Sequence, residues 1–265
     1  MRERRLVFGE VAEQYDRYRP TYPPELVDDL IALAGLDGTQ AVLDVGAGTG
    51  KATVLFALRG IPVVAIEPNA NMAAVARRNL SRFAHVTIEE ADFEAWLPRG
   101  RRFPLLVSGQ AWHWVAREVG YAKAHDVLAQ EGILAAFWNR VAWEKADIRE
   151  ALLEVYARAG SDLSVDGPMH PANASADTEA AWDAGAAADH GLHDAEVRLY
   201  EWEQRYATAE YVGLLATASE VRLLSEERRE PFLAAVAEAI DAHGEPLSIP
   251  MRTLLCLARR GRKTA

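Results

Sequence analysis

The chain has 265 residues, of which 50% are hydrophobic and 26% are charged, the balance of an ordinary globular protein. Its length predicts one large domain, or one domain with a substantial insert. The net charge of -10 disfavours nucleic acid and anionic membranes as partners, because both attract basic surfaces. The single cysteine, Cys256, cannot form an internal disulfide, and no apolar run is long enough to span a membrane. We therefore expect a cytoplasmic protein.

The first two-thirds of the chain alternates between short apolar runs and helical patterns. We expect strands over residues 41–45, 62–66, 86–89, 105–107 and 133–138, and helices over 51–59, 70–80 and 118–129. Apolar strands separated by helices are typical of a parallel sheet covered on both faces. The predicted fold class is therefore α/β, with a doubly wound, Rossmann-like sheet.

The pattern changes after residue 140. An amphipathic helix is predicted over residues 147–159, and the segment 161–194 then lacks Lys and Arg. That segment contains seven acidic residues: Asp162, Asp166, Asp177, Glu179, Asp183, Asp189 and Asp194. Its Pro, Gly and Ala content argues against a conventional strand, so we interpret it as an insert or lid. Regular patterns resume with a strand over 196–207, helices over 209–217 and 225–242, and a closing strand over 248–258.

The strongest local signal is a glycine-rich loop after the first predicted strand. Gly46, Gly48 and Gly50 let the backbone approach a ligand closely, because none of them carries a Cβ atom. Glu67 follows at the end of the second strand, where a carboxylate can accept hydrogen bonds from both hydroxyls of a ribose. The sequence therefore indicates an adenosine-containing ligand at this edge of the sheet.

The spacing of the loop separates two classes of cofactor. A dinucleotide fingerprint has its third glycine at the position of Lys51, whereas here that glycine is Gly50. Asp44 precedes the first glycine by two residues, and its carboxylate would repel a pyrophosphate but suits a ligand with a positive ammonium and sulfonium. The loop therefore favours S-adenosylmethionine over NAD. An NAD-linked oxidoreductase and a non-catalytic protein that only binds the cofactor are the alternatives.

These features resemble the class I S-adenosylmethionine-dependent methyltransferases, in particular the small-molecule branch with trans-aconitate and ubiquinone/menaquinone-type enzymes. The segments that carry the resemblance are 8–23, 43–50, 66–69 with Met72, 90–95 and 109–115. It implies a seven-stranded, mostly parallel sheet whose last strand is antiparallel. It also implies S-adenosylmethionine as cofactor, S-adenosylhomocysteine as product, a small-molecule acceptor and a monomeric or homodimeric protein, without nucleic acid or membrane as partner.

The resemblance also implies roles for individual residues. Glu67 would hold the ribose, and Asp92 the adenine amino group, with Phe93 alongside. The other cofactor-binding residues that it implies are Tyr15, Arg19, Asp44, Gly46, Ala47, Gly48, Gly50, Pro68, Met72, Gln110 and Trp112. The chain then divides into a helical cap over the cofactor (1–35), a cofactor-binding core (36–140), an insert or lid on the acceptor side (141–194) and a segment that completes the sheet (195–265).

Methyl transfer from a sulfonium requires mainly that the protein align the reacting atoms in a dry pocket. A general base is needed only where the acceptor is a hydroxyl or an acidic carbon, and a carboxylate acceptor needs none. His113 is the leading candidate base, because it follows the fourth strand and because histidine ordinarily titrates near neutrality. Alternatively, His113 hydrogen-bonds the backbone or stacks near the adenine without any proton transfer. Asn139 and Arg140 could hold a polar or anionic acceptor, or cap a helix and face solvent.

A metal site is not expected. His190 and His193 lie beside Asp189 and Asp194, but the sequence fixes no third ligand and Gly191 interrupts any shared helix. We interpret these residues as a solvated loop.

Overall fold

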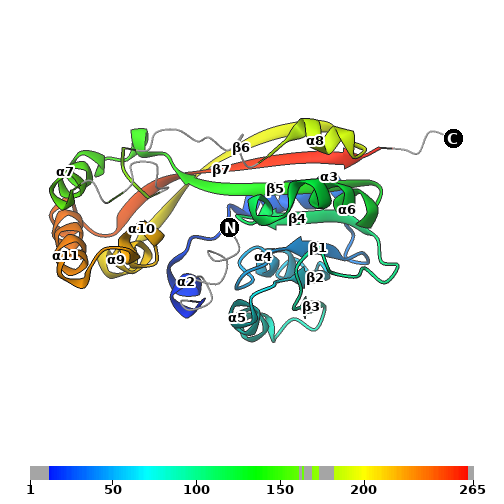
Figure 1. Ribbon diagram of the computed structural model, residues 1–265, viewed down its shortest axis with the longest axis horizontal. Coiled ribbons are helices and arrows are strands. Elements are labelled where there is room, and N and C mark those ends of the chain that lie inside the picture. The colour runs from blue at the N-terminus through cyan, green and yellow to red at the C-terminus, as the bar shows by residue number, and fades with distance from the viewer. Residues whose placement is uncertain (1–11, 161–162, 164–168, 173–181, 262–265) are drawn as a thin grey trace.

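The computed structural model of the chain describes residues 12–160, 163, 169–172 and 182–261. Seven strands form one mixed sheet in the order β3-β2-β1-β4-β5-β7-β6 (Figure 1). In chain order the strands are β1 Val42–Val45, β2 Val63–Ile66, β3 Val86–Glu89, β4 Phe103–Gly109, β5 Leu128–Val141, β6 Leu192–Tyr206 and β7 Leu247–Arg260. The first five are parallel, and β7 runs antiparallel to both its neighbours, β5 and β6. The predicted Rossmann-like sheet with an antiparallel last strand is confirmed.

The central strands are buried on both faces, which explains their continuous apolar sequences. Val42 belongs to a core on one face with Leu30 and Phe56, whereas its neighbour Leu43 belongs to a core on the other face with Tyr121. The helices around this part of the sheet are α3 Pro24–Ala34, α4 Thr53–Ala57, α5 Ala70–Leu80, α6 Arg117–Val127 and α8 Ala184–Asp189. Short 3-10 turns follow β4 at Trp112–Trp114 and β5 at Trp143–Lys145.

Strands β5, β6 and β7 are 14, 15 and 14 residues long, and they extend past the ends of β1 and β4 (Figure 1). Beyond that edge they meet a second group of helices with an apolar cluster of its own. This group consists of α7 Arg149–Ala159, α9 Thr208–Ala216, α10 Ser219–Arg222 and α11 Glu226–His243. Strand β5 extends beyond the predicted range 133–138 at both ends. After residue 138, Asn139 and Arg140 break the apolar pattern but still pair with Thr253 and Arg252 of β7.

In its described part, the acidic segment predicted as an insert or lid contains α8 and the start of β6. Asp183 caps α8 by accepting a hydrogen bond from the Ala186 N–H at 2.8 Å, and it forms an ion pair with Arg117 of α6. Ala187 and Leu192 are buried in the core under α6. Residues 161–162, 164–168 and 173–181 of the segment lie outside the described residues. Residues 184–192 therefore pack with the sheet. Their strand pairing and apolar contacts stabilise regular structure in a segment whose composition argues against it.

Helix α2 (Ala12–Tyr18) precedes the sheet and lies between its edge and the second group of helices (Figure 1). It contacts both α5 and α9. In the part of the chain that the structure describes, no helix combines the length and the apolar character needed to cross a lipid bilayer.

Candidate active site

A cavity of about 890 Å³ opens where the carboxyl ends of β1, β2 and β4 meet the extended ends of β5 and β7. This is the edge at which parallel α/β sheets bind ligands. The glycine loop and Glu67 line one end of the cavity. The other end, which we call the distal chamber, is lined by Tyr206, Tyr211, Leu214, Ala218, Glu220 and Met251.

Most residues predicted to bind the cofactor line this cavity. They are Tyr15, Arg19, Asp44, Gly46, Ala47, Gly48, Glu67, Pro68, Met72, Asp92, Phe93 and Gln110, together with the candidate base His113. Gly50 and Trp112 do not line it. A Cβ atom on Gly50 would lie 2.8 Å from Leu80 Cδ1, so this glycine lets the loop pack against α5. Trp112 is buried edge-on against Tyr121 in the core beneath the site.

Glu67 is held rigidly at the end of β2. Its Oε2 atom accepts a hydrogen bond from the Gly48 N–H at 2.8 Å, and its Oε1 atom accepts one from the Asn69 N–H, also at 2.8 Å. Gly48 has a φ of +59°, and nothing lies within 4 Å of the Cβ position that another residue would fill. The same contacts therefore fix the carboxylate and keep the loop backbone open towards the cavity.

Asp44 is fully buried at the base of the loop. Its Oδ2 atom accepts a hydrogen bond of 2.6 Å from the Thr53 hydroxyl, whereas its Oδ1 atom has no hydrogen-bond partner among the described residues. Burial raises the pKa of Asp44 to about 7, the Thr53 hydrogen bond opposes this shift, and the nearby Glu67 carboxylate adds to it. An unpaired carboxylate oxygen lining a cavity suits a cationic or hydrogen-bond-donating ligand.

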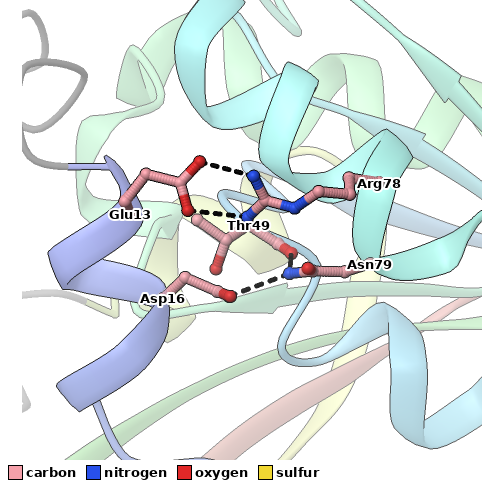
Figure 2. Close-up of polar contacts among 5 residues, drawn as sticks. All are labelled: Glu13, Asp16, Thr49, Arg78 and Asn79. Atoms are coloured by element: carbon pink, nitrogen blue, oxygen red, sulfur yellow. Dashed lines mark hydrogen bonds and ion pairs between the residues drawn. The ribbon is translucent and has the colours of Figure 1, made fainter.

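Helix α2 is fastened to α5 by polar contacts, which Figure 2 shows. Glu13 forms a two-pronged ion pair with Arg78, with distances of 2.5 and 2.7 Å. Asn79 donates one hydrogen bond to Asp16 at 3.0 Å and another to the Thr49 carbonyl oxygen of the glycine loop at 3.1 Å (Figure 2). These contacts tie the helix to the loop that it faces.

The inner face of α2 presents an aromatic ring and a cation to the cavity. The Arg19 guanidinium lies over the Tyr15 ring, 5.5 Å from its centroid, and both residues line the cavity. One turn further along the helix, Tyr18 packs against α9, where a Cβ atom on Gly213 would lie 2.5 Å from the Tyr18 ring. The helix therefore covers the middle of the cavity, as the resemblance implies for a cap.

His113 reaches the cavity from the 3-10 turn after β4. The indole N–H of Trp138 donates a hydrogen bond to its Nδ1 atom at 3.1 Å. Because an indole nitrogen only donates, Nδ1 must present its lone pair, and the neutral ring carries its proton on Nε2. In this state Nε2 is a hydrogen-bond donor, and protonation of Nδ1 would break the contact with Trp138. The geometry favours a donor over a general base, and the base role stays a prediction.

Asn139 and Arg140 both line the cavity, but their polar groups differ in what they contact. The Asn139 amide donates to the Thr21 carbonyl oxygen at 2.7 Å and accepts from the Thr253 hydroxyl at 2.6 Å. Asn139 therefore joins β5, β7 and the segment after α2. Arg140 donates to the Asn139 carbonyl oxygen at 3.0 Å, and burial lowers the pKa of its guanidinium.

The residues of the distal chamber were not predicted from the sequence. Tyr206 and Tyr211 flank the turn from β6 into α9, Glu220 lies in α10, and Met251 lies near the start of β7. Each of them follows the glycine loop by more than 150 residues. The sequence predicted the elements that carry Tyr206, Tyr211 and Met251, but not the short helix α10 that carries Glu220. The two candidate metal ligands lie elsewhere, His190 at the end of α8 and His193 in β6, and the described residues contain no cluster of three ligating side chains.

Comparisons with known proteins agree with this geometry. A family model for a methyltransferase domain matches residues 42–132, which hold the glycine loop, Glu67 and Asp92. An uncharacterised methyltransferase of Mycobacterium tuberculosis is 35% identical over 168 residues, which cover 61% of this chain and 63% of that protein. A probable S-adenosylmethionine-dependent methyltransferase of Saccharomyces cerevisiae is 29% identical over 153 residues, which cover 55% of this chain and 50% of that protein.

Residues 42–132 therefore match the family of methyltransferase domains, and the segment aligned with the mycobacterial relatives spans 63% of their length. The fold of the whole chain is shared with a solved structure, that of a candidate type II methyltransferase from Anaeromyxobacter dehalogenans. The two chains superpose with a TM-score of 0.63 at 22% identity, over 92% of this chain and 98% of that one. The methyltransferase domain matched by the family model ends at residue 132, before the distal chamber begins.

Proposed function

We propose that this protein transfers a methyl group from S-adenosylmethionine to a small-molecule acceptor, at an oxygen, a carbon or a carboxylate. The observation that carries this proposal is the pairing of Glu67 with the glycine loop, beside the unpaired Oδ1 atom of Asp44. Together these residues offer acceptors for a ribose and for a cationic group within one cavity. The name of the yeast relative, which includes S-adenosylmethionine dependence, supports the same cofactor.

The cavity residues fit the parts of this cofactor. Glu67, fixed by two backbone N–H groups, would accept hydrogen bonds from the ribose hydroxyls. Asp92 and Phe93 line the same end of the cavity and would bind the adenine. Asp44 and the backbone around Gly48 would face the cationic part. These assignments follow the family resemblance, and the cavity brings all of the residues together.

S-adenosylmethionine, when bound, supplies a methyl group activated by a positive sulfur. The protein must then hold the acceptor atom in line with the methyl group and exclude water. Holding reacting atoms in such an alignment can lower the activation free energy of a reaction by about 7–11 kcal/mol. Helix α2 covers the middle of the cavity, and buried Tyr22 packs edge-on against Phe137 at its inner wall. His113 would donate a hydrogen bond from Nε2 to the acceptor.

Calorimetric titration with S-adenosylmethionine, S-adenosylhomocysteine and NAD tests the cofactor. We expect both sulfur compounds to bind and NAD to bind much more weakly, because Asp44 lies where a pyrophosphate would approach the loop. Incubation with a small-molecule extract and isotopically labelled S-adenosylmethionine, followed by mass spectrometry, tests the transfer. Preferential binding of NAD would support the alternative oxidoreductase, and binding of S-adenosylmethionine without any labelled product would support a non-catalytic role.

A further inference from the structure

The distal chamber contains buried acceptor groups that no other described residue satisfies. The Oε1 atom of Glu220 and the hydroxyl of Tyr211 are both shielded from solvent, and neither has a hydrogen-bond partner among the described residues. Both residues line the cavity. A buried polar group without a partner is costly, so two of them in one chamber indicate a bound molecule that supplies the missing contacts.

The surroundings of these two groups are apolar. Leu214, Ala218 and Met251 line the same chamber, and Tyr211 itself is completely buried. Glu220 lies close enough to Tyr156 of α7 for its charge to help raise the pKa of that phenol, after the larger effect of burial. The Glu220 carboxyl group therefore lies within the second group of helices, away from the glycine loop.

The cations that line the cavity are Arg19, Lys51 and Arg140, and the Arg19 charge also acts on Tyr206 of the distal chamber, where it opposes the burial that raises the pKa of that phenol. Arg19 lies over Tyr15 of α2, and Arg140 donates to the Asn139 carbonyl oxygen, which also accepts from Gln110 after β4. Both arginines have contacts on the side of the cofactor-binding residues. The six residues that define the distal chamber thus offer a carboxyl group and phenols as hydrogen-bond acceptors, and none of the six is an arginine or a lysine.

We propose that the distal chamber binds an amino group of the methyl acceptor, held by the Glu220 carboxylate and the Tyr211 hydroxyl against an apolar wall. An ammonium group has up to three donors and a positive charge, which matches a carboxylate better than a hydroxyl group does. A carboxylate or phosphate at this position would be repelled. This inference rests on the proposed function and specifies the class of its acceptor, whichever atom of that acceptor receives the methyl group.

Three matched probes test this assignment: 2-phenylethylamine, 2-phenylethanol and phenylacetate share one apolar body and differ in the head group. Their dissociation constants are measured calorimetrically on protein saturated with S-adenosylhomocysteine. Because a hydrogen bond to a charged group contributes about 1.5–3 kcal/mol, we expect the amine to bind about tenfold or more tightly than phenylacetate. The alcohol is expected to bind with intermediate affinity.

Two variants identify the groups responsible. Glu220→Gln should reduce the preference for the amine to about threefold or less, and Tyr211→Phe should weaken amine binding by a smaller factor. Glu226→Gln is the matched control, because Glu226 is exposed six residues later and does not line the cavity. All three variants should keep the wild-type affinity for S-adenosylhomocysteine, which shows that they are folded.

The assignment is overturned if phenylacetate binds as tightly as the amine, if no probe binds, or if Glu220→Gln keeps the wild-type preference. Failure of the proposed function has a different signature, because S-adenosylhomocysteine itself would then not bind. In that event the probe preferences are still measurable on the ligand-free protein, so the two failures can be distinguished.

Discussion

Glu67 is oriented before any ligand arrives, because the N–H groups of Gly48 and Asn69 each hold one of its oxygens at 2.8 Å. An oriented carboxylate binds a diol without losing further side-chain freedom. The same hydrogen bonds hold the glycine loop against the end of β2. A single residue therefore fixes the shape of the loop and holds an oriented carboxylate at the cavity.

Glu67→Gln should therefore weaken S-adenosylmethionine binding by about 10- to 100-fold, the range expected when hydrogen bonds to a charged group are lost. The amide has nearly the same size, so the fold should remain intact. Calorimetry measures the dissociation constant, and Glu90→Gln on the neighbouring exposed segment serves as the control. Wild-type affinity in the Glu67 variant would show that the carboxylate does not contact the cofactor.

The raised pKa of Asp44 predicts how the free energy of unfolding depends on pH. Burial raises the pKa of Asp44 from 3.8 to about 7, so the folded protein keeps a proton that the unfolded chain releases above pH 3.8. Below pH 3.8, protonated Asp44 makes its full contribution to the free energy of unfolding. This contribution decreases as the pH rises towards 7. Asp44→Asn removes the ionisation, so the variant should gain stability relative to the wild type between about pH 5 and pH 8. Thermal unfolding of the ligand-free proteins measures this difference, and a difference that stays constant with pH would contradict it.

Helix α2 connects the cofactor end of the cavity to the distal chamber. Its exposed Glu13–Arg78 ion pair adds little stability, because water and salt screen both charges. Asn79 has more effect on the site, since its amide joins Asp16 of the helix to the Thr49 carbonyl oxygen of the loop. Among the polar contacts between α2 and α5, the Asn79 amide is therefore the one that links the helix directly to the glycine loop.

Asn79→Ala should weaken S-adenosylmethionine binding by about three- to tenfold, since each lost hydrogen bond contributes about 0.5–1.5 kcal/mol. Arg77→Ala, on the same helix but paired with Glu90, is the control and should bind normally. Fluorescence titration measures the dissociation constant of each variant for S-adenosylmethionine. If the two variants bound equally well, α2 would not be positioned through Asn79.

The elements predicted best are those whose signals are local. Helix α5 begins and ends where the apolar period predicts, with Asn69 capping it by accepting from the Met72 N–H. The position of His113 depends instead on Trp138, a residue of another strand, and no local pattern encodes that contact. For the same reason the helical patterns of α9 and α11 were readable in the sequence, whereas the short helix α10 and the convergence of Tyr211 and Glu220 on the cavity were not.

At the scale of the whole molecule, two apolar cores lie on the faces of the sheet and a third joins the helices beyond its edge. The cavity spans this division, with the predicted cofactor residues on the sheet and the distal chamber on the helices. The long antiparallel pairing of β5, β6 and β7 connects the two parts. A change in one core should therefore affect one end of the cavity more than the other.

Ile240→Ala tests this division, because Ile240 of α11 is fully buried in the third core and does not line the cavity. Its truncation should lower the free energy of unfolding by about 2–5 kcal/mol. Because α11 supports α9, which carries Tyr211, we expect the affinity for 2-phenylethylamine to fall severalfold while that for S-adenosylhomocysteine changes by less than about twofold. Leu30→Ala, equally buried beneath the cofactor end, should destabilise the protein to a similar extent without this selective loss. Equal losses of both ligands in Ile240→Ala would mean that the two ends of the cavity respond as one unit.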